Sequence, residues 1–102
     1  MKLDVNYELG EYKFVWDSEK AKINWKKHKV AFEDAARIFL DEYRLDDYDE
    51  SHSEDEDRIK TVGFVRNVLA VIYTERGDRN RIISARRATR REEADYFGQF
   101  KP

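Results

Sequence analysis

Hydrophobic and polar residues repeat with the period of a strand in some segments of the chain and with that of a helix in others. Residues 12–16 (YKFVW) are aromatic and β-branched, which predicts a short first strand. Asp17 is a good N-cap residue, so we expect a helix to begin there. The segment 18–28 contains strong helix formers, and helical spacing places four residues on one face: Ala21, Asn24, Trp25 and His28.

A second helical period runs through residues 30–40 (VAFEDAARIFL). Its apolar stripe is expected to pack most deeply on the sheet and consists of Phe32, Ala35, Ala36, Phe39 and Leu40. After Asp41 the chain is polar and acidic up to Asp57, and we interpret most of this segment as solvated loop. The isolated sequence RLDDY within it predicts a short edge strand.

Three runs typical of strands follow, at residues 58–65, 68–76 and 78–87. The connections between them, at Arg66 and Asn67 and then at Gly77 and Asp78, are short enough for antiparallel hairpins. The central run is the most apolar, so we expect it to be the most buried strand.

The chain ends in a further predicted helix. Thr89 and Glu92 have the spacing of a capping box, and the helix is expected to run to about Phe97 and to end at Gly98. The resulting order predicts an α+β fold with a short N-terminal strand, two helices, a three- to four-stranded antiparallel sheet and a C-terminal helix. With 102 residues the chain has room for one hydrophobic core, so we expect a single domain over residues 1–102, its core at 12–97.

Charge is spread unevenly along the chain, although the formal net charge is only −2. Eight of the twelve residues in 46–57 (DDYDESHSEDED) are acidic. Residues 58–91 hold ten Lys or Arg side chains against two acidic ones, a local net charge of +8. The last third of the chain is therefore a candidate surface for a polyanion.

Several classes of site and location are disfavoured. The absence of cysteine excludes disulfides and thiolate metal sites, and with only two histidines we expect no metal and no cofactor. The acidic segment offers carboxylates, but their spacing fits no calcium-loop pattern, so it is interpreted as a loop that binds a basic part of a partner or shields the basic sheet. No segment has the pattern of a secretion signal or a membrane span, so we expect a cytoplasmic protein without membrane contact.

Three blocks in a fixed order resemble the BrnT family of type II toxins: FVWDSEKAKINWKKHKVAFEDAARIF, HSEDEDR and VIYTERGDRNRIISARRATRREEADY. Their most specific pieces are Asn24 with Lys27 and His28, then Phe32 with Glu33, and residues 81–86 (RIISAR). The resemblance covers roughly residues 14–97 and implies a fold similar to RelE-type ribonucleases. It also implies a toxin that cleaves RNA and is silenced by a BrnA antitoxin with a ribbon-helix-helix domain. DNA would be contacted only through that antitoxin, in a complex that represses its own operon.

The chain departs from the family pattern at two positions between the predicted helices. Lys29 stands where the family usually has Gly, and Ala31 stands where it usually has Ser. A left-handed backbone at Lys29 would cost about 1 kcal/mol, and the loss of the Ser cap would cost about another 1 kcal/mol. We therefore expect this connection to be remodelled or less stable.

Metal-independent RNA cleavage requires attack of a 2′-hydroxyl on the adjacent phosphorus, proton transfer by a base and an acid, and cations that stabilise the transition state. Arginine suits the last task because its planar fork binds phosphate oxygens in pairs. Arg58, Arg81 and Arg86 are therefore candidate catalytic residues. In an ideal strand Arg81 and Arg86 point to opposite faces, so they share a site only where a bulge or the strand end redirects Arg86.

Three further residues are candidates for proton transfer. Tyr73 can donate a proton or stack on a base, but it can also be a core aromatic. Glu75 can act as a base or form a cross-strand ion pair. His52, in the acidic segment, titrates near neutrality. The remaining basic candidates are expected to bind RNA: Lys27, His28, Lys60, Arg76, Arg79 and Arg87. His28 is also compatible with a structural role.

Three functions stay open on this basis. The first is an endoribonuclease toxin that inhibits growth. The second is a catalytically weak partner of a DNA-binding antitoxin, acting in operon autorepression, and the third is a non-catalytic RNA-binding module. The two histidines do not stand close together in the chain, which weakens the case for strong acid–base catalysis.

Overall fold

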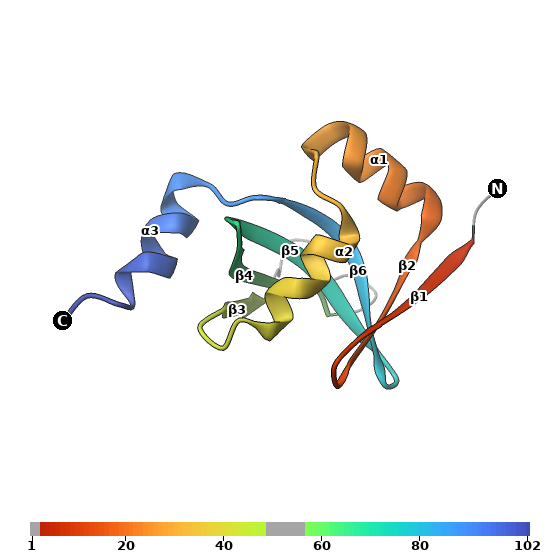
Figure 1. Cartoon of the computed structure of the whole chain (residues 1–102), viewed down its shortest axis with the longest axis horizontal. Coiled ribbons are helices and arrows are strands. Elements are labelled where there is room, and N and C mark those ends of the chain that lie inside the picture. The colour runs from red at the N-terminus through yellow and green to blue at the C-terminus, as the bar shows by residue number, and fades with distance from the viewer. Residues whose placement is uncertain (1–2, 49–56) are drawn as a thin grey trace.

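The computed structural model describes residues 3–48 and 57–102. In these residues a six-stranded sheet runs in the order β1-β2-β6-β5-β4-β3, and α2 crosses in front of its centre (Figure 1). The strands are β1 (Asp4–Leu9), β2 (Tyr12–Asp17), β3 (Leu45–Tyr48), β4 (Ile59–Val65), β5 (Asn67–Arg76) and β6 (Arg79–Arg87). The helices are α1 (Ser18–His28), α2 (Phe32–Arg37), the 3-10 turn η1 (Ile38–Leu40) and α3 (Arg90–Gly98).

The α+β class is confirmed, but the sheet is larger than predicted and is mixed, not purely antiparallel. Strand β1, which the sequence reading missed, forms a hairpin with β2 through a turn at Gly10, whose φ of 60° suits glycine. Strand β2 then pairs with β6 in parallel, with Phe14 opposite Asn80 and Val15 opposite Arg81. This pairing joins segments far apart in the sequence, so no local sequence pattern predicts it. The predicted short edge strand around residues 45–48 is confirmed as β3.

Helix α1 begins where its cap residue predicts. The Asp17 side chain accepts hydrogen bonds from the backbone N–H groups of Glu19 (2.8 Å) and Lys20 (3.3 Å). The helix ends at Lys29, which adopts the left-handed conformation with φ 57° and donates its N–H to the carbonyl of Trp25. The geometry suited to glycine is thus kept with a lysine in place.

The segment 30–40 is not one continuous α-helix, which corrects the sequence prediction. Ala31 begins α2 without a side-chain cap, and after Arg37 the chain tightens into η1. A 3-10 helix has about three residues per turn, so the buried position shifts along the chain. Ile38 is completely buried, whereas Leu40 is 54% exposed.

The main hydrophobic core lies between the sheet and the segment formed by α1, α2 and η1. Phe39 is central to it, with ring centroids 5.0 Å from Phe14 and 4.9 Å from Tyr73. Leu69, Val71 and Tyr73, at alternating positions of β5, all belong to this core. One face of β5 is therefore the face that the first two helices cover.

Helix α3 packs on the other face. Its Tyr96 forms a smaller cluster with Val62, Val68 and Ala70, and its hydroxyl donates a hydrogen bond to Asp41. The predicted capping box is confirmed: the Glu92 N–H donates to the Thr89 hydroxyl, and the Thr89 N–H donates to the Glu92 carboxylate. None of the helices in the described segments has the length and hydropathy of a membrane span.

Candidate functional site

A β-bulge places Arg81 and Arg86 on the same face of the sheet. Ile72 of β5 pairs with Ser84, whereas the next residue, Tyr73, pairs with Ile82, so Ile83 is the extra residue. On one side of the bulge Arg81 lies opposite Thr74, and on the other side Arg86 lies opposite Ala70. Thr74 and Ala70 are four residues apart on one strand and share a face, so their partners share it too.

This face is the one that α1 and α2 leave uncovered, because the odd-numbered residues of β5 point into the main core. We call it the basic face and define it by the cations that the ladder pairing brings there: Lys60, Arg76, Arg79, Arg81 and Arg86. Four of these five come from the last two strands, where the sequence predicted a polyanion surface. The structure thus gathers scattered basic residues of the chain on one side of the sheet.

Glu92 of α3 binds two of these cations. The Arg86 guanidinium donates two hydrogen bonds to it, from Nη1 to Oε1 (2.7 Å) and from Nη2 to Oε2 (3.0 Å). Lys60 Nζ donates a third, to Oε2 (2.8 Å). The Glu92 side chain is only 10% exposed. The hydrogen bonds from Arg86, with those from Lys60 and Thr89, hold the pKa of the Glu92 carboxyl far below its usual range.

Arg81 lies on the same face, near the start of β6. Its Nη2 lies 3.3 Å from the carboxylate of Asp4, which is 62% exposed. Its Nε is buried and has no hydrogen-bond partner within the described part of the chain. A buried donor of this kind is costly to leave unsatisfied.

Arg58 stands just before β4, at the edge of the basic face. The Thr74 hydroxyl, which belongs to that face, donates a hydrogen bond to the carbonyl of Asp57 (2.8 Å). This contact holds Asp57, the neighbour of Arg58, beside Thr74. Thr74 in turn pairs with Arg81 in the sheet. Arg79 lies farther along β6 and donates from Nη1 to the carbonyl of Phe14 (3.2 Å).

Other predicted site residues lie elsewhere. Tyr73 is buried in the main core, where burial raises the pKa of its phenol and Arg44 hydrogen-bonds to it, so it is a core aromatic on the helix-covered side. Glu75 is exposed and has the same strand parity as Tyr73. His52 lies outside the described residues. Lys27 is exposed on the last turn of α1.

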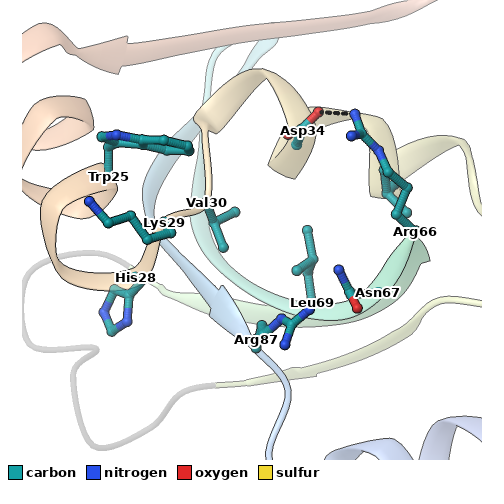
Figure 2. A pocket seen from close by; sticks show the side chains of 10 residues that line it. Trp25, His28, Lys29, Val30, Asp34, Arg66, Asn67, Leu69 and Arg87 are labelled. Carbon is teal, nitrogen blue, oxygen red and sulfur yellow. Dashed lines mark ion pairs between the residues drawn. The ribbon is translucent and has the colours of Figure 1, made fainter.

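His28 and Arg87 line a pocket of about 480 Å³ on the helix-covered side of the sheet. It lies between the end of α1, the start of α2 and the turn that joins β4 to β5 (Figure 2). We call it the α1–hairpin pocket. Its lining side chains are Trp25, His28, Lys29, Val30, Asp34, Val65, Arg66, Asn67, Leu69 and Arg87.

Asn24 has a structural role that its position in the sequence did not reveal. It is 5% exposed, and its amide accepts from the N–H of Ala85 (3.0 Å) and donates to the carbonyl of Ala85 (2.9 Å). The same amide nitrogen donates to the carbonyl of Val30 (3.0 Å). The pairing of β6 with β2 does not extend to Ala85, so the Asn24 amide takes the place of a neighbouring strand there.

Sequence reasoning also missed the part that Glu92 plays in the basic face. Its capping-box spacing was a sufficient signal for a local role in α3, but nothing in that spacing points to Arg86 or Lys60. Over residues 3–48 and 57–102, no three His, Asp or Glu side chains are grouped so that they could hold a metal ion.

Comparison with known proteins gives one family. A search of curated proteins finds no match to the chain. Residues 16–92, most of the chain, match the model of a family described as the ribonuclease toxin BrnT of type II toxin–antitoxin systems. The matched region includes Asn24, the strand β6 that carries both Arg81 and Arg86, and Glu92. A type II system pairs its toxin with a protein antitoxin. The chain therefore belongs to the BrnT family of ribonuclease toxins.

Proposed function

We propose that this protein is an endoribonuclease that cleaves RNA on the basic face without a metal ion and thereby inhibits growth. The observation that carries the proposal is the bulge at Ile83, which brings Arg81 and Arg86 to one side of the sheet together with Lys60. In this proposal the fold is of the RelE type. A BrnA-like antitoxin with a ribbon-helix-helix domain neutralises the enzyme and alone contacts DNA.

The proposed chemistry is attack of a ribose 2′-oxygen on the adjacent phosphorus, with departure of the 5′-oxygen. Negative charge grows on the phosphoryl oxygens in the transition state, and fixed cations that face it lower the barrier. Arg86 and Lys60 are suited to this task because Glu92 holds both in place before RNA arrives. Arg81 is suited to bind the phosphate, because its ion pair with the exposed Asp4 contributes little and exchanges readily.

Glu92 acts in this proposal as a positioning residue and not as the base. Its pKa lies far below the usual range, so the carboxylate stays deprotonated near neutral pH and accepts a proton poorly. Tyr73 and Glu75 have the strand parity of the helix-covered side, away from Arg86. His52, which lies outside the described residues, stays the predicted group for proton transfer, and Arg58 stays a predicted phosphate ligand.

The test is inducible expression in a bacterium, with growth and RNA integrity followed over time. We expect the wild type to slow growth and fragment RNA, and Arg81→Gln to lose both effects. The matched control is Arg91→Gln, which removes the same charge from a side chain that is 90% exposed on α3 and should change neither. A wild-type chain that is folded and abundant yet leaves growth and RNA intact would refute the proposal.

Arg86 needs a control for folding, because Arg86→Gln leaves Glu92 short of a partner. The double variant Arg86→Gln/Glu92→Gln removes the pair together and can keep a neutral hydrogen bond in its place. We expect this double variant to fold and to be inactive. Cleavage by the purified wild type in excess EDTA tests metal independence separately, since activity there should equal that without chelator.

A second function is favoured by one specific observation. Lys60 and Arg86 already have a carboxylate partner in Glu92, as expected for a surface that is internally satisfied and does not await phosphate. The corresponding proposal is a catalytically weak partner of the antitoxin in operon repression. Tight antitoxin binding and operator repression by a wild-type chain that does not cleave RNA would support this function over the first.

A further inference from the structure

The α1–hairpin pocket is separate from the basic face and is built from four segments of the chain. Figure 2 shows Trp25 and Lys29 on one side of it and Arg66 with Asp34 on the other, with Arg87 and Asn67 between them. Val30 and Leu69 line it as apolar residues. The pocket combines an apolar base with a rim of cations, hydrogen-bonding groups and one large aromatic ring.

Both non-glycine residues with positive φ in the described segments line this pocket. They are Lys29 (φ 57°), which ends α1, and Arg66 (φ 59°), in the turn between β4 and β5. Glycine would adopt either conformation with less strain, so at each place a strained backbone carries a long cationic side chain to the same pocket. Such strained positions gather at ligand sites more than elsewhere, and here they coincide with the positive charge.

The charge of the pocket favours an anion. Lys29, Arg66 and Arg87 are cationic, and the pocket has a single acidic residue, Asp34, whose carboxylate lies 3.6 Å from Arg66. That ion pair joins two exposed side chains, 80% and 38% accessible, so it contributes little and does not hold Arg66 away from a ligand. A net positive charge remains on the pocket even with His28 neutral.

Trp25 makes the pocket more specific than a basic patch. Trp25 is 49% exposed, which is high for a tryptophan, and Lys29 Nζ lies 5.6 Å from its ring centroid. An accessible aromatic ring beside cations is the combination that binds single-stranded nucleic acid: the base stacks on the ring while the phosphate meets the cations. An acidic peptide would use the cations but gain little from the exposed ring.

The pocket and the basic face are adjacent at two consecutive residues of β6, Arg86 and Arg87. Arg86 pairs with Ala70 and belongs to the basic face, whereas Arg87 pairs with Leu69 and points to the helix-covered side. The end of β6 therefore carries one arginine to each site.

We propose that the α1–hairpin pocket binds a nucleotide of single-stranded RNA, with its phosphate on Lys29, Arg66 and Arg87 and its base on Trp25. The proposal rests on the proposed ribonuclease function, since it gives the enzyme a second subsite for the strand held at Arg86. It adds a preference for unpaired RNA, because a base within a duplex cannot reach the Trp25 ring.

The decisive variant is the double substitution Lys29→Gly/Arg66→Gly. It removes two cations from the pocket and relieves both strained backbones, so a loss of affinity cannot come from unfolding. The probe is a short fluorescent single-stranded RNA with 2′-O-methyl riboses, which cannot be cleaved because the attacking hydroxyl is blocked. The matched control is Lys22→Gln/Lys26→Gln, which removes two cations from α1 outside the pocket.

We expect the double glycine variant to bind this RNA about tenfold more weakly, and the slope of log affinity against log salt to fall by about 0.7, as for the loss of the one phosphate that the pocket neutralises. The control should change both quantities far less. Trp25→Leu should weaken binding while leaving the salt slope unchanged, because stacking releases no counterions. A duplex of the same sequence should be bound less tightly than the single strand.

Three results overturn the proposal: no RNA binding by the wild type, equal affinity of the glycine variant and the control, or a stronger effect of the glycine variant on binding of a hexaglutamate peptide than of RNA. The last result would assign the pocket to an acidic protein partner.

The ribonuclease function is judged separately, by cleavage of unmodified RNA. Weaker binding in the glycine variant without wild-type cleavage keeps the subsite and refutes the enzyme, whereas wild-type cleavage with unchanged binding does the reverse.

Discussion

Arg86 and Glu92 meet through two parallel hydrogen bonds, Nη1 to Oε1 at 2.7 Å and Nη2 to Oε2 at 3.0 Å. This contact joins β6 to the first turn of α3. The same carboxylate binds Lys60 and caps its own helix at Thr89, so one buried side chain connects β4, β6 and α3. Such shared use makes the carboxylate hard to replace, because each substitution breaks several contacts together.

Glu92→Gln is therefore expected to lower the free energy of unfolding by about 2 kcal/mol, because Arg86 and Lys60 lose their charged partner in a partly buried setting. Urea unfolding at neutral pH measures the change. The double variant Arg86→Gln/Glu92→Gln should recover part of the loss. A single variant as stable as the wild type would show that the contact contributes no net stability.

The depressed pKa of Glu92 also predicts how stability depends on pH. The folded protein holds this carboxyl ionised below the ordinary glutamate value of 4.5, whereas the unfolded chain takes up a proton there. The stabilisation is thus fully present above about pH 5 and is lost as pH falls further. Thermal melting between pH 7 and pH 3 should show a steeper acid decline for the wild type than for Glu92→Gln. Parallel curves would contradict the prediction.

The two departures from the family pattern predict stabilising changes. Lys29→Gly should raise the free energy of unfolding by about 1 kcal/mol, because the backbone there is left-handed, although the contact of Lys29 with Trp25 is lost. The control is Lys26→Gly, which places glycine inside the same helix and should destabilise by about 1 kcal/mol. Equal effects of the two substitutions would mean that the left-handed backbone does not decide the outcome.

Ala31→Ser tests the second departure independently. Ala31 is the N-cap of α2 and makes no side-chain hydrogen bond, whereas a serine hydroxyl would accept one from an N–H of the first turn. We expect a gain of about 1 kcal/mol in unfolding free energy. The effect should add to that of Lys29→Gly, because the two substitutions act on different helix ends. Chemical denaturation of both single variants and the double variant checks this, and no gain from serine would count against the cap.

Short-range signals predicted the local structure well. Asp17 and Thr89 cap the helices that their positions predict, and Gly77 forms the turn between β5 and β6. These signals succeed because each acts on backbone groups within a few residues. Strand β1 had such a signal too, since Val5, Tyr7 and Leu9 alternate with polar residues before Gly10, but none of its residues is fully buried and the pattern is weak.

The candidate site depended on relationships that no short window contains. Ile82 and Ile83 are both apolar, so the pattern gives no sign that Ile83 is a bulge and that Arg81 and Arg86 share a face. In an ideal strand the two arginines would point to opposite faces, but the bulge makes this strand depart from the ideal. The partnership of Glu92 with Lys60 joins residues 32 apart in the sequence and needs the tertiary fold.

Asn24 carries the last prediction, and its contacts explain why one amide matters for the whole sheet. Replacement by alanine leaves the N–H and the carbonyl of Ala85 and the carbonyl of Val30 without partners in a site that water scarcely reaches. We expect Asn24→Ala to lower the free energy of unfolding by about 3 kcal/mol. Asn24→Asp should cost at least as much, because it keeps the acceptor for the Ala85 N–H but turns a negative oxygen towards two carbonyls.

The control is Lys27→Ala on the exposed side of the same helix, which should change stability by less than about 0.5 kcal/mol. Urea unfolding gives the three values, and amide exchange at Ala85 locates the effect: faster exchange in Asn24→Ala than global unfolding explains would show that the edge of β6 opens locally. A loss no greater than that of the control would mean that water replaces the amide and that Asn24 does not hold α1 to the sheet.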